Sequence, residues 1–227
     1  MLILLMAYYA SGELFSDPRG WLITKLIILP GIIIGLSFHE FAHAFVAEKL
    51  GDNTPRLQGR VTLNPMAHID PVGFIALLFV GFGWGQPVEI DPRNFRNRRK
   101  DELMVSLAGV VMNLLLAIVF TIVLKIYVTA SGSWPSMDTL GGMAGELIFY
   151  IIWINLVLMV FNLLPIPPLD GFNVVTELFD LRKYDWWYTV YNNGFIILLI
   201  LIAIDFTDRI MDPILNFLLN IVMGVLF

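Results

Sequence analysis

Long apolar runs, separated by short polar segments, dominate the hydropathy pattern of the chain. Four of these runs approach or exceed the roughly 20 apolar residues that a membrane-spanning helix needs. They cover residues 21–46, 103–129, 143–164 and 188–204. A fifth run, residues 214–227, is short for a full crossing. The pattern predicts an all-α polytopic membrane protein with about five to six transmembrane or membrane-embedded helices.

Residues 71–90 form a different kind of apolar segment. The segment is rich in glycine, and its apolar run lies between Pro71 and Pro87. Irregular backbone at membrane depth persists only where protein or a water-filled cavity covers it. We therefore expect a re-entrant, β-like loop that leaves the membrane on the side from which it entered.

The first ten residues are a short apolar segment without a basic leader, and no small-residue cleavage site follows them. A secretory signal peptide has both features. We expect this segment to be retained and to lie on the membrane or to insert partly into it.

Composition supports the membrane interpretation. Of the 227 residues, 58% are hydrophobic and 15% are charged, whereas ordinary globular chains are about 45–50% apolar. The chain has no cysteine, which excludes disulfides and thiolate metal ligands. Any bound metal must therefore be held by nitrogen and oxygen atoms.

The distribution of basic residues predicts the orientation of the chain. Eight Lys and Arg residues lie between positions 49 and 100, none lies in residues 131–142, and Arg182 and Lys183 follow the third long run. Cytoplasmic loops carry an excess of Lys and Arg. If residues 71–90 re-enter, all the basic loops fall on one side of the membrane, which we expect to be the cytoplasmic side.

Three ionisable side chains share one turn inside the first long run: His39, Glu40 and His43 in the sequence HEFAH. Positions i and i+4 lie on the same face of a helix, so the two imidazoles can bind one zinc ion. Zinc lowers the pKa of a bound water from about 15.7 to about 7, and a carboxylate beside it can accept the proton. The motif therefore predicts two zinc ligands and one general base, Glu40.

An ordinary polar contact between helices is the alternative explanation of these side chains. Intramembrane ionisable groups are costly and usually functional. Two of the three histidines of the chain lie at ligand spacing around a glutamate. This combination favours the metal site.

Catalytic zinc takes three protein ligands and leaves a fourth position for water. The candidates for the third ligand are Glu146, Asp205, His68 and Asp170. Asp170 follows the third long run in NLLPIPPLDGF, where prolines break the helix and can turn a carboxylate back into the bundle. His68 lies in a polar loop with Asp70. These positions favour Asp170 over His68.

Three stretches in this order resemble the site-2 protease family of intramembrane zinc metalloproteases: HEFAH, LAGVVMN and NLLPIPPLDG. The resemblance covers roughly residues 22–180. RVTLNPMAHIDPVG and GWGQPVEIDPRNFRN also resemble the compact prokaryotic branch, in which this stretch forms a membrane-dipping β-like loop. The resemblance implies that His39, His43 and Asp170 bind one zinc ion per chain and that Glu40 activates the water.

The resemblance also bears on domain organisation and location. Family members commonly carry a PDZ or CBS domain, but the stretch between His43 and Asp170 leaves no room for a PDZ insertion. We expect one integral-membrane metalloprotease domain over residues 1–227, with a core over residues 22–180 and C-terminal membrane helices over residues 188–227. We expect it in the plasma membrane of a prokaryote, with the active site toward the cytoplasm.

Four further polar residues are candidates for supporting roles. Asn113 lies one helical turn after Gly109 and either steadies an oxyanion or makes an interhelical hydrogen bond. Asn162 either grips the substrate backbone or caps the broken helix. Gln86 lies where an unwound peptide can pair with a strand edge. His68 is expected to order the loop before the re-entrant segment, with a substrate contact or a contact behind a metal ligand as the alternative.

Together these observations predict an intramembrane zinc metalloendopeptidase that acts on transmembrane proteins or peptides in the lipid bilayer. Relatives of this kind act in regulated intramembrane proteolysis or in clearance of signal-peptide remnants. No nucleic-acid partner is expected, and the sequence defines no oligomeric state.

Two alternatives belong to other functional classes. One is a metal-ion transporter that uses the three ligands as a transient site, but a transporter has little use for a base, Glu40, that is not a ligand. The other is a proteolytically inactive relative that only binds membrane helices. No motif residue is missing, which argues against it.

Overall fold

The fold is described by a computed structural model for residues 16–80, 83–132, 134–136 and 138–226, and these residues are almost entirely helical. The helices are α2 (Pro18–Lys49), α3 (Thr54–Leu57), α4 (Pro71–Val80), α5 (Arg98–Ser131), α6 (Leu140–Asn162), α7 (Asp170–Phe179), α8 (Asp185–Asn192), α9 (Gly194–Ala203) and α10 (Phe206–Leu226). Single 3-10 turns lie at Pro65–Ala67 (η1), Pro92–Asn94 (η2) and Leu181–Lys183 (η3). The segment over residues 1–10 that we expected at the membrane lies outside the described residues.

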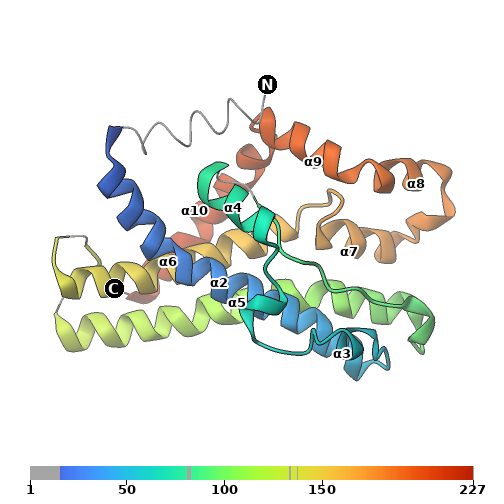
Figure 1. The fold of residues 1–227 in the computed structure, drawn as a ribbon, viewed down its shortest axis with the longest axis horizontal. Coiled ribbons are helices and arrows are strands. Elements are labelled where there is room, and N and C mark those ends of the chain that lie inside the picture. The colour runs from blue at the N-terminus through green and yellow to red at the C-terminus, as the bar shows by residue number, and fades with distance from the viewer. Residues whose placement is uncertain (1–15, 81–82, 133, 137, 227) are drawn as a thin grey trace.

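Among the described residues, four helices, α2, α5, α6 and α10, are long and apolar enough to cross a membrane. A fifth span results if the bent pair α8 and α9 counts as one. Helices α2, α5 and α6 contact one another pairwise, and α10 packs on α5 and α6 (Figure 1). The all-α polytopic fold is confirmed.

Close helix contacts depend on small residues. Gly31 and Gly35 lie one turn apart on α2, facing α6. A Cβ atom at Gly31 would lie 3.0 Å from the Tyr150 carbonyl oxygen, and one at Gly35 would lie 2.6 Å from Cδ1 of Leu158. Glycines at this spacing let the backbones of membrane helices approach. The approach brings this part of α2 into the bundle, and HEFAH begins one turn after Gly35, toward the C-terminal end of the helix.

The C-terminal part of the fold differs from the prediction in two places. The prediction of a single helix over residues 188–204 is wrong. The chain breaks at Asn193, and the axes of α8 and α9 are bent by 63° relative to each other. Asn and Gly have low helix propensity, and Gly194 packs closely against Pro167 at the break. The prediction that the last helix is too short to cross a membrane is also wrong, because α10 begins at Phe206 and is 21 residues long. Polar residues in the first half of α10 delay the start of the apolar run to residue 214, but the helix itself already begins at Phe206.

The described residues of the segment 71–90 fold back against the residues that precede the segment. Helix α4 covers the first ten of them, and an antiparallel bridge joins Ile69 to Gly85. The Gln86 amide donates to the His68 carbonyl at 2.7 Å, so the two ends of the segment lie side by side. Among the described residues the β-like character is limited to this bridge. The re-entrant placement in a membrane stays a prediction.

Candidate metal centre

Helix α2 places His39 and His43 on one face, as the i, i+4 spacing requires. Their Nε2 atoms are 3.0 Å apart. Both side chains are buried, against Gly109 of α5. A Cβ atom at Gly109 would lie 2.5 Å from Nε2 of His43, so glycine is needed where α5 passes the two imidazoles.

Asp170 brings the third ligand atom to the same point. It is the first residue of α7, directly after the proline-rich turn that follows α6. Its Oδ2 atom lies 3.2 Å from Nε2 of His39 and 3.2 Å from Nε2 of His43. Within the part of the chain that the structure describes, these three residues are the group whose ligand atoms converge as a metal site requires.

The spacing of the three atoms fits a tetrahedral zinc ion. Zinc binds histidine nitrogen and carboxylate oxygen at about 2.0–2.2 Å, and two such ligands at a tetrahedral angle lie about 3.3 Å apart. The observed separations are 3.0, 3.2 and 3.2 Å. The Asp170 Oδ2 atom is buried and has no hydrogen-bond partner among the described residues.

The hydrogen bonds behind the imidazoles define their tautomers. Nδ1 of His39 lies 2.6 Å from Oδ1 of Asn113, and Nδ1 of His43 lies 2.7 Å from the Val105 carbonyl oxygen. Both partners are acceptors, so each Nδ1 carries the proton and each Nε2 presents a lone pair. With both imidazoles neutral, two lone pairs and a carboxylate oxygen therefore face one point, which is the arrangement that a cation satisfies.

Glu40 lies beside the three candidate ligands but is not part of the converging group. Its Oε2 atom accepts a hydrogen bond from the Val88 amide at 3.1 Å. Together with the ligands it lines a cavity of about 810 Å³. A carboxylate at this place can accept a proton from water without occupying a position on the metal.

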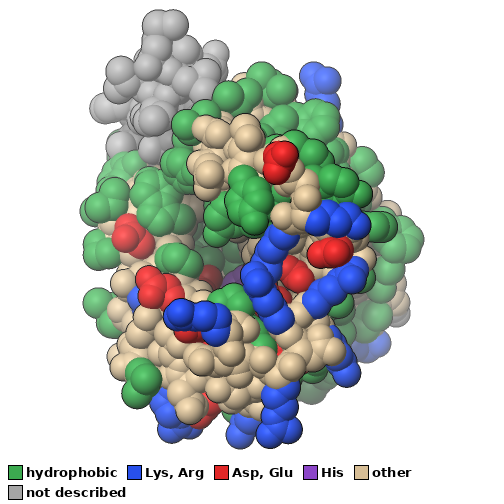
Figure 2. All heavy atoms as spheres, turned by 90° about the vertical axis from the view of Figure 1, so that its right-hand side faces the viewer, with side chains coloured by type: hydrophobic (Ala, Val, Ile, Leu, Met, Phe, Trp, Pro, Cys, Tyr) green, Lys and Arg blue, Asp and Glu red, His purple; other side chains and the backbone are tan. Residues whose placement is uncertain are grey.

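The cavity opens on the face that carries the connecting segments between α2 and α5 and the turn from α7 to α8. Figure 2 shows Lys and Arg side chains gathered around a hollow on this face, with a histidine visible inside. Arg98 and Arg182 line the cavity, and so do Trp187, Tyr188 and Tyr191 of α8. His39, His43 and Asp170 thus lie inside a hollow that is lined by charged residues of both signs, with Lys and Arg side chains prominent around its mouth.

Pro87–Ile90 lines one wall of the cavity, and the residues that follow this segment are held by Asp52, three residues after the end of α2. The Asp52 carboxylate is fully buried and accepts hydrogen bonds from the Asp91 amide at 2.7 Å and from Asn94 Nδ2 at 2.8 Å. Burial alone would raise the pKa of Asp52, but its hydrogen bonds from Thr54, Asn94 and the Asp91 amide outweigh it and lower the pKa below its usual value. The wall is therefore fixed to the helix that carries His39 and Glu40.

A cluster of charged residues fixes α7 to the start of α5. Glu102 is buried and accepts from Arg98 at 2.7 Å and from both terminal nitrogens of Arg182, and Arg182 also lies 2.9 Å from Glu177. Arg99 donates to the last carbonyls of α7. Burial raises the pKa of Glu177 above its ordinary value despite the Arg182 guanidinium. Because the buried Glu102 of α5 is paired with Arg182, which follows α7, and Arg99 of α5 bonds to α7 itself, this cluster holds α7, and with it Asp170, in place.

The four residues predicted to support the site lie in different surroundings. Asn113 is fully buried and both of its amide N–H groups are used, by Gly35 O and by Asn155 Oδ1. This geometry favours the interhelical hydrogen bond over an oxyanion contact. Asn162 lines the cavity and donates to the Leu158 carbonyl of its own helix at 2.9 Å.

Gln86 and His68 lie away from the metal ligands. The Gln86 side chain is exposed, and the cavity wall is formed by the residues that follow it, Pro87–Ile90. His68 is fully buried, and its Nε2 donates to the Thr62 carbonyl at 2.8 Å. It orders the loop before α4 and takes no part in the converging group.

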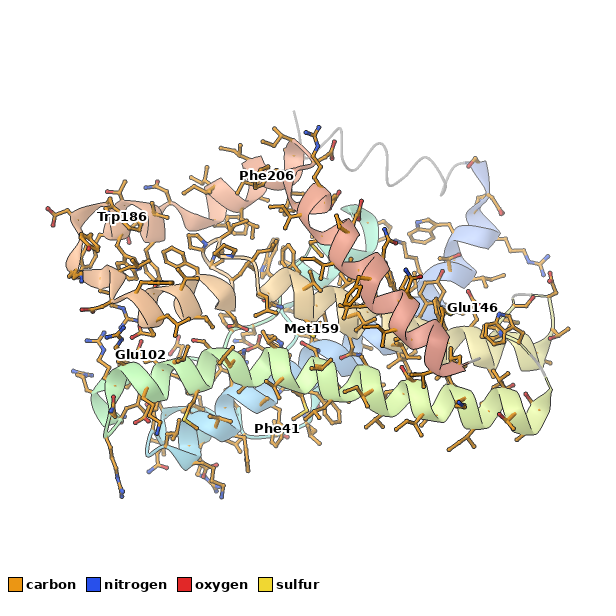
Figure 3. The ribbon with its side chains drawn as sticks, turned by 180° about the vertical axis from the view of Figure 1, so that it is seen from behind. Phe41, Glu102, Glu146, Met159, Trp186 and Phe206 are labelled. Atoms are coloured by element: carbon orange, nitrogen blue, oxygen red, sulfur yellow. The ribbon has the colours of Figure 1, made fainter. Side chains whose placement is uncertain are left out.

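Two further alternatives for the third ligand, Glu146 and Asp205, also lie outside the converging group. Figure 3 shows Glu146 at the opposite end of the bundle from Glu102, which lies at the cavity mouth.

Several residues of the site had no strong signal in the sequence. Asp52 is one polar residue within a polar loop, and the role of the Val88 amide belongs to the backbone. Asn155 had a signal that could have found it, because it is the one amide side chain in the middle of the third apolar run. Glu102 and Arg182 are far apart in the chain, and their pairing follows only from the packing of α7.

The fold and site define a helical membrane protein in which two histidines and one aspartate form a group that could hold a metal ion, with a glutamate beside it. The chain belongs to peptidase family M50, whose family model matches residues 27–202. The resemblance to the site-2 protease family is thereby confirmed.

Individual relatives agree with the family match. The chain is 40% identical over 188 residues to a Bacillus subtilis protein named "Putative zinc metalloprotease YwhC", covering 82% of this chain and 84% of the relative. It is 28% identical to "Putative zinc metalloprotease MJ0611" of Methanocaldococcus jannaschii, over 76% of this chain and 81% of the relative. It is 30% identical to "Putative zinc metalloprotease Rip2" of Mycolicibacterium smegmatis, over 70% of this chain and 59% of the relative. No solved structure matches the chain significantly.

Proposed function

We propose that the protein is an intramembrane zinc metalloendopeptidase, with one zinc ion per chain held by His39, His43 and Asp170. The observation that carries the proposal is the convergence of two imidazole lone pairs and one carboxylate oxygen within 3.2 Å of one another, with Glu40 beside them. Zinc is the metal in the names of the relatives, and the nitrogen and oxygen donors suit it.

When bound, zinc supplies Lewis acidity that polarises a carbonyl and lowers the pKa of water. Glu40 accepts the proton of the attacking water and later delivers it to the leaving amine, which makes it the general base and then the general acid. The Val88 amide holds one carboxylate oxygen of Glu40, so the other is left to face the water. The cavity of about 810 Å³ has room for a peptide segment beside these groups.

The same geometry weighs against a metal-ion transporter. A transport site must release its ion, and the imidazole positions here are fixed by buried hydrogen bonds behind both rings. Glu40 contributes no ligand atom to the converging group, whereas peptide hydrolysis requires a base at this place.

The proposed substrates are transmembrane proteins or peptides, in regulated intramembrane proteolysis or in clearance of signal-peptide remnants. The support is the place of the ligands: HEFAH lies within α2, which is long and apolar enough to cross a membrane. A peptide bond that reaches this site has to come from a segment at or near the bilayer.

We place the protein in the plasma membrane of a prokaryote with the cavity mouth toward the cytoplasm. The support is the basic rim of the hollow in Figure 2 and the excess of Lys and Arg in residues 49–100. A topology reporter inserted at Asn97 is expected to give a cytoplasmic signal. An external signal from this reporter would reverse the orientation.

The function is tested with the full chain purified in detergent and reconstituted with a model transmembrane substrate. We expect cleavage that stops when a zinc chelator is added and returns with added zinc. Cleavage that persists in a protein shown to contain no transition metal would refute the proposal.

A further inference from the structure

Two asparagines, Asn113 on α5 and Asn155 on α6, meet in the interior where both helices contact α2. Both side chains are fully buried. Buried amides in a membrane protein are costly unless they are hydrogen-bonded, and each of these two amides is bonded on both its oxygen and its nitrogen side.

The hydrogen bonds of the pair define which end of each amide is the oxygen and which is the nitrogen. Asn155 Nδ2 donates to the Ile151 carbonyl at 2.8 Å, so Asn155 Oδ1 must face Asn113. Asn113 Nδ2 donates to that oxygen at 2.8 Å and to the Gly35 carbonyl at 3.2 Å. The Oδ1 atom of Asn113 is then left to face Nδ1 of His39 at 2.6 Å.

We propose that Asn155, acting through Asn113, is a positioning residue for the metal centre: the pair fixes the proton of His39 on Nδ1. The inference rests on the proposed zinc site. Two backbone carbonyls, at Ile151 and Gly35, set the orientation of both amides, because a carbonyl can only accept. With both amides oriented in this way, the Oδ1 atom of Asn113 faces His39 and accepts the proton that Nδ1 donates. The Nε2 atom of His39 is thereby kept free of a proton and available to the metal.

Reversal of the Asn113 amide would have a direct effect on the ligand. Its NH₂ group would then face Nδ1 of His39, and two donors would oppose each other. The imidazole would regain a hydrogen bond only by moving its proton to Nε2, among the converging ligand atoms. A protonated Nε2 has no lone pair for a metal.

His43 provides an internal reference for this effect. Its Nδ1 donates to the backbone carbonyl of Val105 at 2.7 Å, which no amide reversal can change. Because the chain has three histidines, the imidazole resonances of His39 and His43 can be assigned by single substitutions and followed separately.

The test compares Asn155→Leu with Asn155→Asp and with a control, Thr121→Val. Leucine removes the oxygen that accepts from Asn113, while a neutral aspartic acid keeps an acceptor oxygen and can donate to the Ile151 carbonyl. Thr121 is a buried polar residue on α5 whose hydroxyl donates to the Ala117 carbonyl of its own helix at 2.7 Å. Nitrogen-15 NMR of histidine-labelled, metal-free protein reports the tautomers, and competition with a chelator reports the zinc affinity.

In Asn155→Leu only the Gly35 carbonyl still orients the Asn113 amide, so we expect a mixture of the two His39 tautomers, an unchanged His43 tautomer, and zinc affinity lower by about 10–100-fold, the effect typical of partners behind metal ligands. Asn155→Asp and Thr121→Val should keep the original tautomer and affinity. An Asn155→Leu protein with an unchanged His39 tautomer would refute the inference, as would an Asn155→Asp protein that behaves like the leucine variant. Failure of the wild-type protein to bind zinc would instead refute the proposed function.

Discussion

Replacement of Glu40 by glutamine is expected to leave the metal in place and to reduce peptide cleavage by about 10²–10⁴-fold, the contribution typical of a general acid–base group. Glutamine has the same shape as glutamate, and its side-chain oxygen can still accept the hydrogen bond that the Val88 amide donates to Glu40. The cavity wall should therefore keep its position. What glutamine lacks is the ability to take a proton from water.

The measurements are the zinc content of the purified protein and its rate of cleavage of a transmembrane substrate. Glu48→Gln is a suitable control, because Glu48 lies on the same helix two turns further and pairs with Arg56 outside the cavity. Exposed ion pairs of this kind contribute little to stability, so this variant should retain both zinc and activity. Undiminished cleavage by Glu40→Gln protein would remove Glu40 from the reaction, and loss of zinc would make it a ligand.

The sequence was most informative where the signal is local. The apolar runs placed α2, α5 and α6 within a few residues of their observed ends, because length and hydropathy alone decide whether a segment can span a bilayer. The periodicity of a helix places His39 and His43 on one face, whatever the rest of the fold does. Asp170 could be chosen because few acidic or histidine side chains lie near the apolar runs.

Features that depend on packing could not be predicted. The bend at Asn193 reflects the contact between Gly194 and Pro167, which lie 27 positions apart. The start of α10 at Phe206 was hidden because polar residues shortened the apolar run without ending the helix.

The contacts behind the site are of the same kind. The partner of Asn113 depends on how α2, α5 and α6 cross, which no local pattern defines. Asp52 is recognised as the anchor of the cavity wall only when residues 91–94 are seen beside it.

The second large effect is expected at Asp170. Asp170→Ala protein should lose zinc affinity by more than the roughly 10–100-fold that partners behind a ligand contribute, because it removes one of three ligands. The two imidazole nitrogens would remain 3.0 Å apart, but a two-ligand site does not provide the coordination that zinc takes in proteins. The zinc content after dialysis, measured by mass spectrometry, reports this loss directly.

His68→Ala is the matched variant for this experiment. His68 is more deeply buried than Asp170, with no exposed surface, and it ties the loop before α4 to the Thr62 carbonyl. Loss of the His68 side chain should therefore lower the stability of the fold at least as much as loss of the Asp170 side chain. It removes no ligand atom of the converging group. We expect His68→Ala protein to be less stable to heat but to purify with zinc. If instead the His68 variant lost its metal while the Asp170 variant kept it, the third ligand would be His68, and α7 would have to move away from the two imidazoles when zinc binds.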